Sequence, residues 1–357
     1  MQEIIHSLWF GLACLAALGA VLTLLLRAAR IPGGTPAASI AAGIISGTLL
    51  GATVLGNVNP DLHMYWFIGG VEESRAITEL LRQHERDLVA LDASGVSPEG
   101  TSELMLEQLN EQAEYRTVRT QAQKHHELLL TRASLALLVA MVLAVAFHYQ
   151  KPITRLPVVS RLLAALLAGV TTGISCLILV TALKPQFQFL GIPYSVKTSF
   201  FVLAGVCACT NFRIFQAHQR RSSSILWLIC VPTLTALCFT HISLVDDIDA
   251  LSFVLIFLAV AIASHDGRWL GAWLGIRMFG NEKLHSAQWQ SSGKILDEGA
   301  GAAQASLAGF LAGIGFLSPT LGATLILSAL IIELCQPIRQ PVARWMDEQF
   351  SPQPDPE

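Results

Sequence analysis

Nine apolar runs, each long enough to cross a lipid bilayer, constrain this chain more than any other feature. Most hold about 17 to 23 residues, and a helix needs about 20 to cross a hydrocarbon core of about 30 Å. Only 14% of the chain is charged, whereas a soluble domain carries about 25%. The pattern predicts an all-α integral membrane protein with about nine transmembrane helices. The expected spans are 4–26, 35–56, 131–149, 161–183, 198–215, 224–242, 250–279, 299–317 and 320–336.

The distribution of Lys and Arg orients these expected spans. If the N-terminus lies outside, the cytoplasmic loops and tail hold thirteen Lys and Arg, whereas the short outer loops hold only two. Cytoplasmic loops of membrane proteins carry such an excess of positive residues. We therefore expect an N-terminus outside the membrane and a C-terminus in the cytoplasm.

A long polar insertion separates the second expected span from the third. Residues 57–130 hold thirteen acidic and six basic residues, and their apolar positions recur at the spacing of a helix. Turn-forming residues at 94–100 divide them, so the sequence predicts a charged helical hairpin on the non-cytoplasmic side. Its second arm could continue into the third span. The expected units are two spans in 1–60, the hairpin 61–130, a bundle of about seven spans in 131–337 and a partly disordered cytoplasmic tail 338–357.

Two interpretations of the hairpin stay open. A solvated amphipathic pair of helices would explain the charge and the helical spacing. A coiled-coil contact would explain them equally, either to a second copy in a homodimer or to another partner.

The common motifs of catalysis are missing from the sequence. It contains no P-loop, no GxSxG, no HExxH and no spaced set of Cys and His. The seven Cys all fall inside apolar runs, where they are typical of small buried hydrophobes. The net charge of −3 argues against a nucleic-acid partner. We therefore expect no enzymatic activity, no cofactor and no metal site, and a lipid bilayer as the main partner.

Ionisable residues inside apolar runs are the candidates for chemistry, because a charge at mid-bilayer costs a few kcal/mol or more. His265, Asp266 and Arg268 lie in the middle of the run 250–279. Asp266 and Arg268 are two residues apart, so on a regular helix they point to different faces and each needs another partner. Alternatively the run ends at Ser264, and the three residues form a cytoplasmic turn.

Two further groups are candidates for ion coupling or ion attraction. Glu333 lies near the cytoplasmic end of the last span, as either a buried acid of a transport core or an interfacial acid at a helix end. His241 lies near the outer end of the sixth span, shortly before Asp246 and Asp247. These three residues could form an outer vestibule that attracts cations, or a plain solvated acidic loop.

Two stretches carry a family resemblance. The first, Arg30–Pro60, has a basic residue and Pro before the second span and a Gly-rich ending, with Ala52 at a position where Pro is usual. The second, Gly267–Gly280, looks like a Lys-x-x-Gly-Ala-x-x-x-x-Arg-x-x-Gly segment, with Arg268 in place of the lysine. Both resemble the sodium/hydrogen exchanger superfamily, in particular bacterial monovalent cation/proton antiporters. The resemblance implies an antiporter-like helix bundle in a bacterial inner membrane, with protons and a monovalent cation as the transported ions.

The chain also departs from that family. Members usually have more spans, and a broken central helix carries aspartates that bind the cation and the proton alternately. The sixth span here contains Pro232 and Thr233 but no acid. If transport is retained, Asp266 with Arg268 as counter-charge is the expected coupling carboxylate. The alternative is a non-transporting membrane scaffold or sensor that binds a partner through the outer hairpin.

Overall fold

The computed structural model describes residues 2–94, 98–147, 226–241, 301–317 and 319–339, together with residues 166, 167, 170, 171, 341, 342 and 345. Every regular element within these residues is helical, so the prediction of an all-α chain is confirmed for the described part. The number of spans and the antiporter-like arrangement stay predictions.

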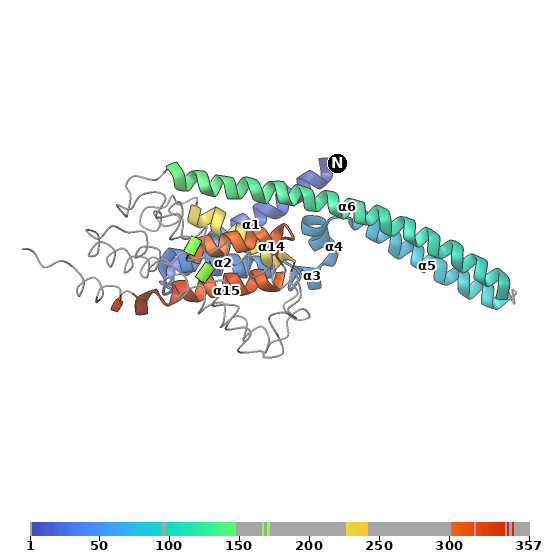
Figure 1. Ribbon diagram of the computed structural model, residues 1–357. Helices are drawn as coiled ribbons and strands as arrows, with labels where there is room; N and C mark the ends of the chain where they lie inside the picture. The colour runs from blue at the N-terminus through green and yellow to red at the C-terminus, as the bar shows by residue number, and fades with distance from the viewer. Residues whose placement is uncertain are drawn as a thin grey trace, which may run out of the picture.

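Five of the described helices pack into a bundle (Figure 1). α2 packs against α1 and α10, and α14 packs against α10 and α15. All residues of α10 are buried, so this helix forms the centre of the described bundle. The five helices are α1 (Gln2–Ala28), α2 (Gly34–Leu50), α10 (Val231–Thr240), α14 (Gly301–Gly313) and α15 (Pro319–Leu334).

Glycines allow α2 and α14 to approach the backbone of α10. A Cβ added to Gly43 of α2 would lie 2.6 Å from the Cβ of Thr235 and 2.7 Å from the carbonyl oxygen of Pro232. On the other side, Gly309 of α14 packs directly against the carbonyl of Leu234. Any larger side chain at these two positions would push the helices apart, so the small residues set the spacing of the bundle.

The centre of the bundle contains an interrupted helix. The π-helix η2 (Leu226–Cys230) leads directly into α10, and Pro232 follows within the first turn. Proline donates no backbone hydrogen bond, and π-turns leave the usual ladder of an α-helix. The interruption falls inside the expected span 224–242, where Pro232 gives the local cause.

α2 ends at Leu50, several residues before the end of the expected span 35–56. Gly51 packs against backbone carbonyls of α2 and α10, and the N–H of Ala52 donates to the Thr240 carbonyl at 3.1 Å. Short helices α3 (Leu55–Val58) and α4 (Pro60–His63) and the π-helix η1 (Met64–Ile68) then follow.

An aromatic cluster fixes η1 on the bundle, a contact that the sequence analysis did not predict. Phe67 is 1% exposed. The ring of Trp66 lies edge-on to Phe10 of α1, with centroids 5.6 Å apart, and to Phe67 at 6.2 Å. These rings join the segment between α4 and α5 to the first helix.

α5 (Val71–Ser94) and α6 (Pro98–Phe147) lie side by side and project from the bundle (Figure 1). We call α5 and residues 98–125 of α6 the arm. Ile77 and Leu80 are buried, and His84 continues their helical spacing and contacts Glu111 of α6 at 3.2 Å. α6 is uninterrupted, so it spans about 75 Å at 1.5 Å per residue. It includes most of the expected span 131–149.

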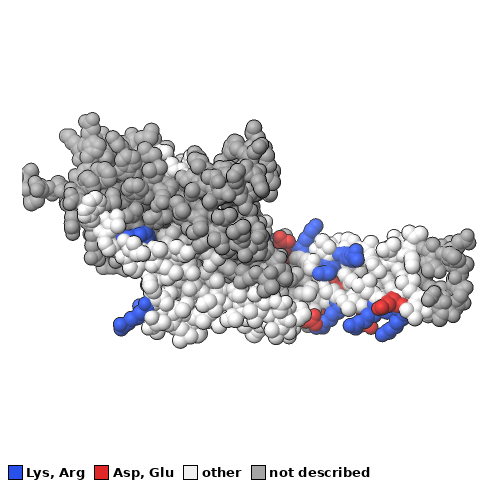
Figure 2. Space-filling model, turned by 90° about the horizontal axis from the view of Figure 1, so that it is seen from below, with Lys and Arg blue, Asp and Glu red and all other residues white. Residues whose placement is uncertain are grey.

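Charge and apolar length divide the described molecule into two parts. Figure 2 shows Lys, Arg, Asp and Glu gathered over the arm, while the described surface of the bundle in the same view carries few charges. By length and composition, two stretches of the described chain could cross a membrane: Ser7–Ala28, and Gly34–Val58, which includes α2 and α3. Both overlap the first two expected spans.

Candidate functional site

Glu333 is buried at the end of the bundle opposite the arm. It is 1% exposed, and its Oε1 accepts a hydrogen bond from the backbone N–H of Gly301 at 2.8 Å. Gly301 is the first residue of α14, where backbone N–H groups have no partner within the helix. The carboxylate therefore caps α14 and ties its first residue to the last turn of α15.

A second helix begins next to the backbone of Glu333. Gly33, which precedes α2, has φ of 82° and packs against the backbone carbonyl of Glu333. Two helix N-termini, those of α2 and α14, therefore meet the last turn of α15. A side chain at position 33 would collide with that turn, and its positive φ is one that glycine adopts without cost.

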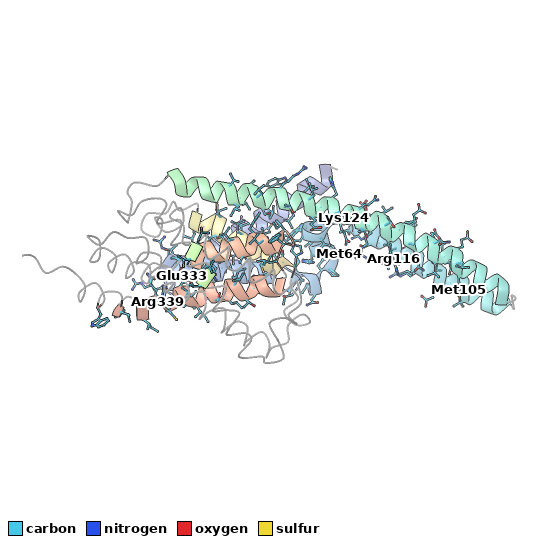
Figure 3. The ribbon with its side chains drawn as sticks, viewed as in Figure 1. Met64, Met105, Arg116, Lys124, Glu333 and Arg339 are labelled. Atoms are coloured by element: carbon cyan, nitrogen blue, oxygen red, sulfur yellow. The ribbon has the colours of Figure 1, made fainter. Side chains whose placement is uncertain are left out.

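A buried guanidinium lies at the same end of the bundle. Arg339 is 6% exposed, and its Nη2 donates to the carbonyl oxygen of Ile332 at 2.5 Å. That carbonyl belongs to the last turn of α15, where a positive charge is favourable. Figure 3 shows Glu333 and Arg339 at this end, far from the labelled residues of the arm.

Polar side chains continue from Glu333 along the contact between α14 and α15. Gln304 is 3% exposed, and its amide donates to the Leu325 carbonyl and to the Ser328 hydroxyl, both at 3.0 Å. Ser328 donates in turn to the Leu325 carbonyl at 2.8 Å. We call Gln304, Ser328 and Glu333 the polar seam.

Two buried hydroxyls lie in the central helix. Thr233 is 1% exposed and Thr235 is fully buried, and neither Oγ1 has a hydrogen-bond partner among the described residues. Thr240 at the end of the same helix differs, because its Oγ1 donates to the Leu237 carbonyl at 2.8 Å. The interrupted start of α10 thus coincides with two polar atoms that lack a bond.

The structure separates the candidate residues that it describes. Glu333 lies beside the start of α2, whereas His241 follows α10 at the end of the bundle where α2 finishes. The length of α2 puts about 25 Å between these ends, so the two residues do not share a site. His265, Asp266, Arg268, Asp246 and Asp247 lie outside the described residues.

The sequence analysis missed several residues of this region. Gln304 was visible as a polar residue in an apolar run, at a spacing from Gly301 that places both on one face of a helix. Arg339 was assigned only to the cytoplasmic tail, because its burial depends on how the chain folds back after Pro337. Within the described chain, no cluster of three or more His, Cys, Asp or Glu could hold a metal ion.

No protein-family model matches the chain, and no curated protein or solved structure matches it either.

Proposed function

We propose that this chain is an integral membrane protein that exchanges protons for a monovalent cation, with buried carboxylates as the coupling groups. The observation that carries the proposal is the burial of Glu333 in an apolar bundle, where it is 1% exposed. A carboxylate in such surroundings binds a proton and a cation in competition, because either one neutralises its charge. Asp266 and Arg268 join the proposed site through the resemblance to antiporters.

The surface of the bundle supports a bilayer as its environment. Trp9, Phe10 and Leu25 of α1 are 55%, 59% and 60% exposed, although all three are large and apolar. Some buried hydroxyls bond within their own helices, as Thr23 does with the Gly19 carbonyl at 2.7 Å and Thr240 with the Leu237 carbonyl at 2.8 Å. An apolar bundle surface, with buried hydroxyls that bond to backbone carbonyls of their own helices, is the arrangement expected for a protein surrounded by lipid.

The two ends of the bundle support the proposed orientation. Trp9, Phe10 and Tyr65 are exposed at the end where the arm begins, and aromatic rings collect at the interfaces of membranes. Arg27 and Arg30 are exposed at the other end of α1. This arrangement favours an outer arm and a cytoplasmic end that contains Glu333.

The bond between Glu333 and Gly301 suggests how ion binding would alter the bundle. In the ionised state the bond is charge-assisted, and protonation weakens it. Binding a proton at Glu333 would therefore loosen the start of α14 from the last turn of α15. In the proposed cycle this loosening lets one group of helices rock against the other and changes the side from which the site is reached.

Flux through reconstituted liposomes tests the proposal. The vesicles carry an internal pH dye and an imposed pH gradient, and sodium, potassium or lithium is then added. The wild-type protein should collapse the gradient with at least one cation. Glu333→Gln removes the charge but keeps an oxygen that can accept from Gly301. Asp266→Asn removes the charge of the second carboxylate. We expect the collapse to be lost in one or both variants.

The matched control is Glu114→Gln, because Glu114 is exposed on the arm and should not affect flux. Cation-dependent collapse that survives both core substitutions would remove these carboxylates from the mechanism. A protein that is correctly folded in the vesicles and collapses no gradient with any cation would contradict transport altogether.

One observation favours the alternative of a scaffold or sensor. Apolar side chains are exposed on the distal half of the arm, including Val89 at 66%, Leu106 at 61% and Leu109 at 60%. Such residues on a charged, projecting pair of helices suit a contact with another protein. A scaffold would show no flux, and substitution of these residues by serine would abolish its partner contact without changing its fold.

A further inference from the structure

Two buried histidines fasten the segment formed by α4 and η1 to the helices around it. His63 of α4 is 4% exposed, and its Nε2 donates to the Thr240 carbonyl at the end of α10, at 2.9 Å. His126 of α6 is 1% exposed, and its Nε2 donates to the Trp66 carbonyl of η1 at 3.1 Å. A carbonyl oxygen only accepts hydrogen bonds, so both rings carry a proton on Nε2.

The second nitrogen of His126 has no partner within the described part of the chain. Its Nδ1 is buried and makes no hydrogen bond with any residue that the structure describes. In the neutral ring this atom holds a lone pair, because Nε2 carries the proton. Protonation would place a new N–H and a positive charge in a buried position without an acceptor, which is unfavourable.

The same ring lies against the joint of the arm. Gly69 and Gly70, with φ of 80° and 72°, connect η1 to α5. A Cβ added to Gly69 would lie 2.6 Å from the Cβ and 2.9 Å from the Cγ of His126. Two successive glycines can change their backbone angles at little cost, so they can act as a hinge between η1 and α5. The His126 ring packs against Gly69, so a shift of the ring would let this hinge move.

The groups around the two histidines offer little to neutralise a positive charge. Asp61 is paired with Arg75 at 2.6 Å, and residues Ser7–Ala28 of α1, η2 and α14 contain no Asp or Glu. Burial lowers the pKa of both His63 and His126, against the opposing effect of their hydrogen bonds to carbonyls. The other titratable or charged neighbours are His241 at the end of α10, Tyr65 of η1, and Arg119, Lys124, His125 and Glu127 of α6.

We propose that His63 and His126 form an acid-sensitive latch that holds residues 63–70 against α10 and α6. With both rings neutral, this segment is held through the Thr240 and Trp66 carbonyls. When a ring is protonated, its bond is lost and the segment is released, with Gly69 and Gly70 as the hinge to α5. The latch depends only on these contacts, so it stands whether or not the bundle transports ions.

The direction of the pH effect follows from proton linkage. In the released state the rings meet water, and their pKa returns to the ordinary value of about 6.5. The released state therefore binds more protons than the latched state below this pH. The latch is fully closed above about pH 6.5 and weakens as the pH falls toward the lower pKa of the latched state.

Hydrogen exchange of the purified protein tests the latch. Amide protection in residues 64–70 is compared at pH values from about 7.5 to about 5, after correction for the intrinsic exchange rates. Each unit by which burial lowers a pKa should cost the wild type up to about tenfold in protection on acidification. His126→Gln keeps an N–H donor for the Trp66 carbonyl but cannot be protonated in this range. Only His63 still titrates in this variant, so it should lose clearly less protection on acidification than the wild type. His125→Gln changes the neighbouring exposed histidine and should behave as the wild type.

Three results would overturn the latch. The first is wild-type protection that does not change with pH. The others are a pH response of protection in His126→Gln as large as that of the wild type, and loss of that response in His125→Gln. If His126→Gln fails to reach the helix content of the wild type at neutral pH, His63→Gln replaces it with the same expectation.

Discussion

Replacing Gly43 by Ala should destabilise the bundle measurably, because α2 and α10 meet at this position. The new Cβ would lie 2.6 Å from the Cβ of Thr235, about 0.8 Å closer than ordinary contact, and the nearby Pro232 carbonyl belongs to the rigid backbone. Overpacking of this kind costs about 1–3 kcal/mol. Alanine recovers up to about 1 kcal/mol over glycine through its helix propensity. Because the clash includes backbone, the overpacking cost should lie in the upper part of that range, about 2–3 kcal/mol, and the expected net loss is about 1–2 kcal/mol.

Thermal unfolding in detergent, followed by tryptophan fluorescence, measures this loss. A change of about 1–2 kcal/mol corresponds to a drop in Tm of roughly 1–3 °C for a chain of 357 residues. Gly56→Ala is the control, because its nearest neighbour would be the His63 ring at 3.5 Å, an ordinary contact distance. That variant should stay within about 0.5 kcal/mol of the wild type. An unchanged or raised Tm for Gly43→Ala would refute the close packing of α2 on α10.

Two further substitutions test the end of the bundle and the arm. Glu333→Ala should destabilise the protein by about 2–4 kcal/mol, because it leaves a cavity and an unbonded N–H at Gly301. Glu333→Gln keeps an acceptor and should lose clearly less stability in the same melting experiment. Equal losses in the two variants would contradict the helix cap. Leu80→Ala removes a side chain buried between α5 and α6 and should speed hydrogen exchange in α5, with a local cost of about 2–3 kcal/mol. Val89→Ala on the exposed surface of the same helix should change exchange by less than about 0.5 kcal/mol, and similar effects of the two would contradict the pairing of α5 with α6.

Much of the described fold could be predicted from the sequence because apolar periodicity and turn residues act locally. The helical spacing of apolar residues in the polar insertion predicted helices there, and the break around residues 94–100 lies where α5 ends and α6 begins. The segment Met64–Ile68 was not predicted as a packed element. Its burial depends on α1 and α6, which are distant in sequence, and aromatic residues in a short run suit a loop and a helix equally well.

The candidate site was less predictable, because burial of polar groups depends on tertiary contacts. Glu333 could be named from its place in an apolar run, but its bond to Gly301 requires α14 to begin beside the end of α15. The partners of His63 and His126 are backbone carbonyls, which no side-chain pattern in the sequence reveals. Both histidines lie in the polar insertion, where a histidine is ordinarily exposed.

Proton movement driven by a cation gradient tests the central claim most directly. Liposomes containing the protein are loaded with sodium, diluted into sodium-free medium of equal pH, and followed with an internal pH dye. Equal potassium on both sides with valinomycin holds the voltage at zero. Vesicles loaded with potassium contain no valinomycin, and equal thiocyanate on both sides, a permeant anion, holds their voltage near zero instead. The account predicts that outflow of the cation acidifies the interior, and that Glu333→Gln or Asp266→Asn abolishes the acidification. A leak cannot move protons against equilibrium, so acidification would establish exchange. An interior pH that stays constant with each cation, in vesicles holding folded protein, would contradict the account.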